Sequence, residues 1–201
     1  MSKRVFDVDA QNQDLAAKIV AGLERVAETF RVLLWDHVKK IGLSPIQIQL
    51  LIFTHYHAEE WCNVSDFARE FNMTKPTISD AVRVLHKKEL IQKIPSPTDG
   101  RAYHIQLTGE GEKIVQETAD FGSPVYQVIA GFKQDDQQHF YRLLNELVFK
   151  LNRKGVIQIQ RSCQNCRFYQ ADGEERFCQF LGKPLSTSDL RLDCPEFEVA
   201  G

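Results

Sequence analysis

Four of the five cysteines lie close together near the end of the chain, where their thiols have the spacing of metal ligands. They follow the pattern Cys163-x2-Cys166-x11-Cys178-x15-Cys194. The segment between the second and third cysteines contains Asp172-Gly173, a dipeptide typical of a hairpin turn. Such a hairpin would return Cys178 to the Cys163/Cys166 corner, and the chain beyond it is long enough to return Cys194. We therefore predict that all four thiolates converge on one centre.

Residues 156–201 contain few aliphatic side chains, so this segment needs more than surface burial to fold. A zinc site of four cysteines is the interpretation we favour, because such structural sites are common and match the C-x2-C corner. An iron–sulfur cluster would use the same thiolates and stays open, because the second pair of cysteines is split. Two disulfides would suit an oxidising compartment, which nothing else in the sequence indicates. The segment is then either a structural cap or a sensor of metal or redox state.

A second group of ligand-type residues, His55-Tyr56-His57-Ala58-Glu59-Glu60, is better interpreted as a polar helix end than as a metal site. His55 and His57 are two positions apart and would point in different directions on a helix, and no third ligand is spaced to join them. Cys62 is interpreted as a small buried apolar residue.

Residues 74–85 have the pattern of a helix that contacts DNA. Ile78, Val82 and Leu85 recur at helical spacing and form one apolar stripe. The remaining positions carry hydroxyls near the start and cations towards the end, a set suited to base edges and phosphates. The residues that we expect to contact DNA are Thr74, Lys75, Thr77, Ser79, Arg83 and Lys87.

The flanking residues complete a helix-turn-helix followed by a hairpin. Asn63 or Ser65 can cap a preceding helix, and Thr74 is the expected N-cap of the DNA-contacting helix. Residues 91–94 and 102–107 read as strands around a tip at 95–101 that is rich in turn residues. A basic hairpin beside a recognition helix predicts a winged helix.

The tip residues Asp99-Gly100-Arg101, followed by Leu107-Thr108 and Gly111, resemble the wing signature and helix start of MarR-type transcriptional regulators. The resemblance covers residues 10–152. It implies a homodimer with one recognition helix in each major groove, Arg101 in or near the minor groove, and Asp99 supporting that arginine. Glu89 departs from the family pattern, which usually has glycine there; glutamate disfavours the left-handed helix end.

Long helices are expected on both sides of the winged helix. Near-helical apolar spacing runs from residue 14 to residue 41 with Gly42 as a stop, residues 1–9 are expected to be a loose arm, and the next helix covers 43–57. A helix begins after Thr108, Pro124 should break it near 120–124, and a final helix spans 135–152 before Gly155. The fold class is therefore mainly α: a winged helix-turn-helix domain with long dimerisation helices and a small cysteine-rich α+β or loop module.

We divide the chain into an N-terminal arm and dimerisation helix (1–42), a winged helix-turn-helix domain (43–111), C-terminal dimerisation helices (112–155) and a four-cysteine metal-binding module (156–201). The net charge is −2 overall, but residues 74–104 carry six basic and three acidic side chains. This local positive charge indicates DNA contact in the middle of the chain. No apolar run is long enough for a membrane span or a signal peptide, so we expect a cytoplasmic protein.

The sequence contains no paired general acid and base, no nucleophile with a base and no phosphate-cradling glycine loop, so we expect no enzyme. The predicted function is a dimeric, sequence-specific regulator of transcription that binds double-stranded DNA as a repressor and responds to a ligand, metal or redox state. A small-molecule effector is a candidate further partner. The alternatives are a metal- or iron–sulfur-dependent redox or sensor protein, and a protein-docking module built on the four-cysteine tail.

Overall fold

The computed structural model describes residues 5–95, 103–158, 161–173 and 175–199. The helices are α1 (Val8–Gln13), α2 (Leu15–Ile41), α3 (Pro45–Tyr56), α4 (Val64–Glu70), α5 (Lys75–Lys87), α6 (Gly109–Thr118), α7 (Ser123–Ala130) and α8 (Gln134–Arg153). The strands are β1 (Ile91–Pro95), β2 (Tyr103–Leu107), β3 (Tyr169–Asp172), β4 (Glu175–Cys178) and β5 (Lys183–Pro184). Short 3-10 helices are η1 (Glu59–Trp61), η2 (Cys163–Asn165) and η3 (Thr187–Asp189). Within these described ranges, no helix combines the length and the apolar character that crossing a membrane requires.

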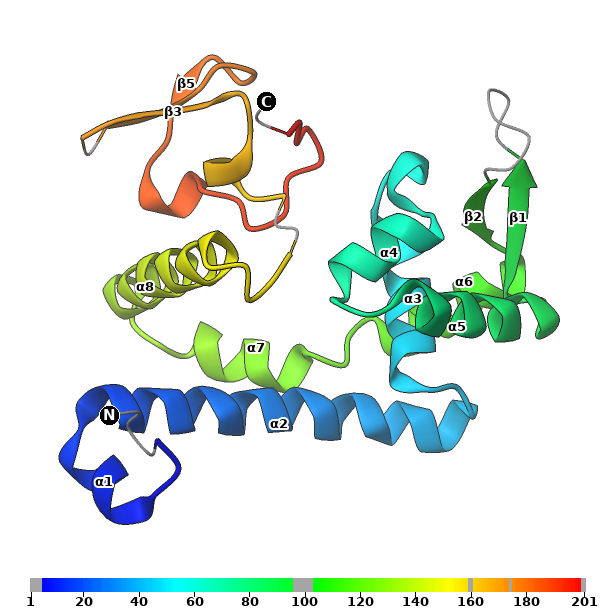
Figure 1. Cartoon of the computed structure of the whole chain (residues 1–201), viewed down its shortest axis with the longest axis horizontal. Coiled ribbons are helices and arrows are strands. Elements are labelled where there is room, and N and C mark those ends of the chain that lie inside the picture. The colour runs from blue at the N-terminus through cyan, green and yellow to red at the C-terminus, as the bar shows by residue number, and fades with distance from the viewer. Residues whose placement is uncertain (1–4, 96–102, 159–160, 174, 200–201) are drawn as a thin grey trace.

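Helix α2 runs along one side of the molecule, and helices α3 to α8 and both sheets lie on the same side of it (Figure 1). The winged helix, made of α3 to α6 with β1 and β2, lies at the C-terminal end of α2. Helix α7 lies along the middle of α2, where Phe30 meets Phe121 edge-on with ring centroids 6.4 Å apart. Helix α8 follows, and residues 161–173 and 175–199, which we call the cysteine module, pack on its far side through η3.

The main hydrophobic core belongs to the winged helix. Its fully buried side chains come mainly from α3, α4, α5, α6 and β2, and include Ile48, Leu51, Phe67, Ile78, Leu85 and Ile105. Helix α3 begins as predicted, because Pro45 occupies its first turn and Ser44 and Gln47 form a capping box. The apolar stripe expected of residues 74–85 is buried in this core, so α5 presents its polar face outward.

The helix-turn-helix is confirmed by its local hydrogen bonds. Asn63 caps α4 by accepting the backbone N–H groups of Ser65 and Asp66, each at 3.0 Å. Asn72 adopts a left-handed conformation with φ of 51°, which reverses the chain between α4 and α5. The Thr74 hydroxyl then accepts the Thr77 N–H at 3.3 Å, so Thr74 is the N-cap that the sequence indicates.

Glu89 adopts the left-handed conformation that usually favours glycine, with φ of 58°. Helix α5 ends just before it, and the Leu90 N–H donates to the Leu85 carbonyl at 3.0 Å. The Thr108 hydroxyl donates to the Glu89 carbonyl at 2.6 Å. Helix α5 therefore ends with the left-handed backbone conformation that a glycine would adopt at this position, although the residue is a glutamate.

The hairpin pairs β1 with β2 in antiparallel register, with Ile91 opposite Leu107. The Ile105 N–H also donates to the Cys62 carbonyl at 2.8 Å, which fixes the hairpin beside η1. The predicted break is confirmed, because α6 ends at Thr118 and α7 begins at Ser123. The expectation of a loose arm over residues 1–9 is corrected in part, since Asp7 caps a short helix, α1, that begins at Val8.

Gly111 allows close contact between α6 and Leu90, which lies between α5 and β1. A Cβ atom at Gly111 would lie 2.0 Å from the Leu90 carbonyl oxygen, whereas one at Gly109, in the same helical turn, would meet nothing within 4 Å. We expect Gly111→Ala to lower the free energy of unfolding by about 1–3 kcal/mol or more through overpacking. Gly109→Ala should leave it unchanged or raise it slightly. Urea unfolding followed by circular dichroism measures both, and equal stability of the two variants would contradict this account.

The left-handed conformation of Glu89 predicts that a glycine would be more stable there. Glu89→Gly should raise the free energy of unfolding by up to about 1 kcal/mol, since the cost of the left-handed conformation exceeds the gain in unfolded-state entropy. Lys88→Gly is the matched control, because Lys88 has a negative φ of −83° and should lose stability when replaced. The same urea titration compares the two, and destabilisation by Glu89→Gly would show that the helix end is not strained.

Candidate nucleic-acid interface and cysteine pocket

The residues predicted to contact DNA lie on the outward side of α5, and we call this surface the recognition face. Its members are the exposed residues Thr74, Lys75, Thr77, Ser79, Arg83 and Lys87. The sequence predicted that these residues contact DNA, and the structure places five of them on α5 and Thr74 at its N-cap, all exposed to solvent. The helix is free to enter a groove because its apolar side is already buried in the core.

In the absence of DNA, two interactions within the protein hold side chains of the recognition face. Thr74 and Thr77 share a hydrogen bond at 2.8 Å between their hydroxyls, so both are partly committed to capping the helix. Arg83 pairs with Asp80 at 2.7 Å, and both side chains are more than two thirds exposed. An exposed pair of this kind is weak, so phosphate or a base edge can replace Asp80 as the partner of the arginine.

The wing rises beside α5 (Figure 1). At its base the Lys93 ammonium lies over the Tyr103 ring, 4.6 Å from the centroid, which keeps a cation on the hairpin. The predicted wing residues Arg101 and Asp99 lie outside the described residues, so their roles stay predictions.

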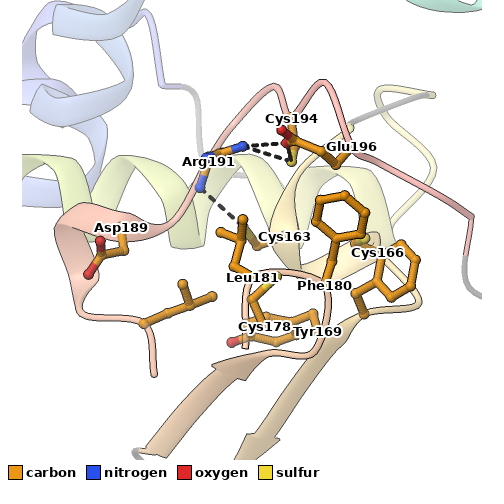
Figure 2. A pocket seen from close by; sticks show the side chains of 12 residues that line it. Cys163, Cys166, Tyr169, Cys178, Phe180, Leu181, Asp189, Arg191, Cys194 and Glu196 are labelled. Carbon is orange, nitrogen blue, oxygen red and sulfur yellow. Dashed lines mark hydrogen bonds and ion pairs between the residues drawn. The ribbon is translucent and has the colours of Figure 1, made fainter. Parts of the chain in front are cut away.

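The four cysteines predicted to be ligands line one pocket in the cysteine module (Figure 2). The hairpin that the sequence indicated at Asp172-Gly173 is confirmed, with β3 and β4 in antiparallel register and Gly173 at a φ of 58°. It returns Cys178 opposite Tyr169, near η2. The free space among the lining side chains is about 20 Å³, roughly what one water molecule occupies.

The thiols are not yet assembled around one point. Across the described part of the chain, no three His, Cys, Asp or Glu side chains stand as a group ready to hold an ion. Cys163 accepts the Arg191 backbone N–H at 3.2 Å, and Cys194 donates to the Glu196 carboxylate at 3.3 Å while Arg191 contacts its sulfur at 3.4 Å (Figure 2). The convergence predicted from the sequence is therefore found as a shared pocket and not as an assembled centre.

Burial raises the pKa of two of the pocket thiols, Cys163 and Cys194. Burial is the main cause that raises the pKa of Cys163, and the neighbouring Cys178 and Cys166 raise it further. The pKa of Cys194 is also raised by burial, although its hydrogen bond with Arg191 opposes the change. Cys62 lies apart from the four, in the core of the winged helix, where burial raises its pKa to about 11. The expectation that it is a buried apolar residue is confirmed.

The cysteine module is attached to α8 by buried polar contacts. The Tyr141 hydroxyl donates to the Leu190 carbonyl, and the Gln164 amide donates to Asn145, which is only 2 % exposed. Tyr141 also packs against the small module core of Cys163, Leu185 and Leu190. These contacts fix the module against α8.

A second attachment joins the module to the winged helix, and it was not predicted. Arg161 is 4 % exposed and pairs with Glu70 of α4 at 3.0 Å and with Asp193 at 2.8 Å. His57 joins the same group, since its Nε2 lies 2.7 Å from Asp193 Oδ2. We call these four side chains, Arg161, Glu70, Asp193 and His57, the Arg161 latch.

Aromatic rings of the winged helix enclose the latch. The Arg161 guanidinium lies 5.0 Å from the Phe53 ring centroid and 5.8 Å from that of Trp61. The His57 ring stacks on Phe53 at 3.7 Å. These contacts stabilise a buried cation that would otherwise be costly to remove from water.

The pKa values in the latch follow from burial and charge together. Burial alone would lower the pKa of His57, but hydrogen bonds to Asp193 and the Phe53 carbonyl outweigh it, so the pKa is raised. Burial raises the pKa of Glu70, with Arg161 opposing. Burial would also raise the pKa of Asp193, yet His57 and Arg161 hold it well below its usual range. The polar helix end at His55–Glu60 is thus an ion-pair site, and His55 separately pairs with Glu112 at 2.7 Å.

Comparison with known proteins agrees with this geometry. A family model described as MarR family matches residues 41–102. The match spans α3, α4, α5 and β1, which is less than half of the chain. The uncharacterized HTH-type transcriptional regulator YhbI of Bacillus subtilis (strain 168) is 27% identical over 113 residues, which cover 52% of this chain and 73% of that protein.

Solved structures share the MarR-type fold at low sequence identity. MepR of S. aureus in its DNA-binding conformation is 19% identical with a TM-score of 0.59, covering 66% of this chain and 98% of MepR. The MepR–DNA complex is 20% identical with a TM-score of 0.58, covering 66% and 97%. A MarR/EmrR family regulator from Acinetobacter sp. ADP1 is 19% identical with a TM-score of 0.57, covering 70% and 99%. The cysteine module lies outside the residues that the MarR family model matches.

Proposed function

We propose that this protein is a dimeric, sequence-specific DNA-binding regulator of transcription, acting as a repressor whose affinity for its operator responds to a ligand, metal or redox state. The observation that carries the proposal is the recognition face, which exposes three cations and three hydroxyls on α5 while the opposite side of the helix is buried. This is the arrangement that a major groove requires. The names of the MarR-type relatives support a regulatory and not a catalytic role.

DNA in the major groove would replace weak local partners of the recognition face. Arg83 can exchange Asp80 for a phosphate or a guanine edge, and Lys75 and Lys87 stand at opposite ends of α5 to meet the phosphates on either side of the groove. The wing, with Lys93 at its base and Arg101 at its predicted tip, would follow the adjacent minor groove.

Dimerisation is supported by apolar surface on α2 and α8 that one chain leaves uncovered. Helix α2 buries only Ala17 and Leu34 along its 27 residues. Its exposed large apolar side chains are Leu15, Ile19, Val20, Val26, Phe30, Val32 and Trp35. On α8, Phe140, Leu143 and Leu147 form an exposed stripe at helical spacing. A second copy related by a two-fold axis would cover these surfaces, because an isologous interface matches each patch to itself.

The dimer proposal predicts the effect of a charge on the α8 stripe. The wild-type protein should sediment at twice the 23.1 kDa of one chain, and Leu143→Glu should shift it towards the monomer. Arg153→Glu introduces the same side chain at the exposed end of α8, off the stripe, and should leave the mass unchanged. Analytical ultracentrifugation distinguishes them, and a monomeric wild-type protein would end the proposal that α2 and α8 dimerise.

DNA binding should depend on arginines of the winged helix. With a duplex recovered by in vitro selection and fluorescence anisotropy at fixed salt, Arg83→Ala and Arg101→Ala should each weaken binding about tenfold or more without changing the unfolding midpoint. Arg167→Ala is the matched control, since Arg167 forms an exposed pair with Glu198 at 2.9 Å outside the winged helix. Unchanged affinity for both winged-helix variants would refute the assigned interface.

A further inference from the structure

The cysteine pocket and the Arg161 latch meet at two neighbouring residues, Cys194 and Asp193. Cys194 lines the cysteine pocket, and it also lines an open groove together with His57, Trp61, Arg161 and Asp193. The Cys194 backbone N–H donates to the Arg161 carbonyl at 3.0 Å. Asp193, the preceding residue, is the acid that joins Arg161 to His57. A displacement of Cys194 therefore acts directly on the Arg161 latch.

The pocket has the chemistry of a site for one soft metal ion. Four thiols line a cavity of about 20 Å³, which has room for a single ion but not for an organic effector. The described part of the module buries few hydrophobic side chains, namely Cys163, Leu185, Leu190 and Phe197. A fold of this size with so small a core requires a cross-link or a metal. The cysteines are free thiols and not disulfides, so they are available as ligands.

We infer that the cysteine pocket binds one thiophilic divalent ion, represented by Zn²⁺, and that binding repositions the winged helix relative to α8 through the Arg161 latch. This inference rests on the proposed DNA-binding function, whose regulation it specifies. The ligands are Cys163, Cys166, Cys178 and Cys194.

Ion binding must convert four thiols into thiolates. Four sulfur–metal bonds form, four S–H bonds break, and the protons pass to solvent, which leaves the bound centre with a net charge of −2. Arg191 supplies hydrogen bonds to two of the sulfurs, because its guanidinium, which also pairs with Glu196 at 2.6 Å, contacts the Cys194 sulfur and its backbone N–H donates to Cys163. Hydrogen bonds of this type support metal-bound sulfur.

Convergence of the thiols requires Cys194 to leave its present partner. Its thiol now donates to Glu196 at 3.3 Å, and an S–metal bond removes that donor. The backbone at Asp193 and Cys194 then moves towards Cys163. Arg161 is drawn along because its carbonyl accepts the Cys194 N–H and its guanidinium donates to Asp193, and Glu70 at the end of α4 follows. Because α4 leads directly into the recognition helix, the site acts on the DNA-contacting helix.

The first experiment compares the apo and Zn²⁺-loaded full-length protein. Elemental analysis after loading and desalting should give one zinc per chain, and Co²⁺ should produce the intense thiolate-to-cobalt absorption of a four-sulfur site. The affinity for the selected duplex, measured by anisotropy at fixed salt, should differ between the two forms by about fivefold or more. No bound metal, or iron with acid-labile sulfide in protein purified without oxygen, would overturn the single-ion assignment.

Three variants separate the site from its coupling to DNA. Cys178→Ser should lose the metal and the difference in DNA affinity. Arg161→Gln should keep one zinc per chain but reduce the affinity difference to less than about twofold, and Glu70→Gln, which preserves size and hydrogen bonding, should act in the same direction. Arg167→Gln, the exposed control in the same module, should retain both the metal and the full difference.

The outcomes also distinguish this inference from the proposed function. If neither form of the wild-type protein binds any duplex with saturation, the DNA-binding function fails. If both forms bind equally while one zinc is present, the function stands and the coupling is refuted. If Arg161→Gln and Glu70→Gln both keep the full zinc-dependent difference, the latch is not the route.

Discussion

The buried guanidinium of Arg161 is the interaction on which the arrangement of this molecule depends. A cation that is 4 % exposed is stable only where acids and rings surround it, and here they come from three separate parts of the chain. Glu70 ends α4, Asp193 belongs to the cysteine module, and Phe53 lies in α3. Removing Glu70 or Asp193 would leave the buried guanidinium with only one of its two carboxylate partners. The winged helix and the module are therefore held in one relative position.

The second constraint is the apolar surface of α2. A helix of 27 residues that buries two of them in its own chain is not stabilised by that chain alone. Its core-facing end is fixed where Leu34 joins the winged-helix core, and the rest offers apolar side chains to solvent. Helix α8 exposes an apolar stripe of its own. Both features argue for a partner chain, and a two-fold axis would place the two recognition faces symmetrically.

Sequence reasoning succeeded where the signal is local and failed where it is not. Thr74, Pro45, Gly42 and the Asp172-Gly173 turn each act within a few residues, and each element that they indicated is present. Glu89 shows the limit of local preference, because tertiary contacts impose a left-handed conformation on glutamate. The Arg161 latch joins residues separated by up to 136 positions. No periodicity or spacing rule reports such pairs, and His57 was therefore interpreted only as part of a polar helix end.

The position of the cysteine module explains how a local change could have a long-range effect. The module is fixed to α8 through Tyr141 and Asn145 and to α4 through Glu70, so it bridges the helix that carries an exposed apolar stripe and the helix that precedes the recognition helix. If the module contracts between its contacts with α8 and its contact with α4, these two helices would rotate relative to each other, since buried contacts hold the module to both. In a two-fold dimer both winged helices move together, and the spacing of the recognition helices changes by the sum of the two displacements. Half-site spacing in DNA is fixed by the double helix, so in the proposed dimer a small change at each module would alter the affinity for DNA.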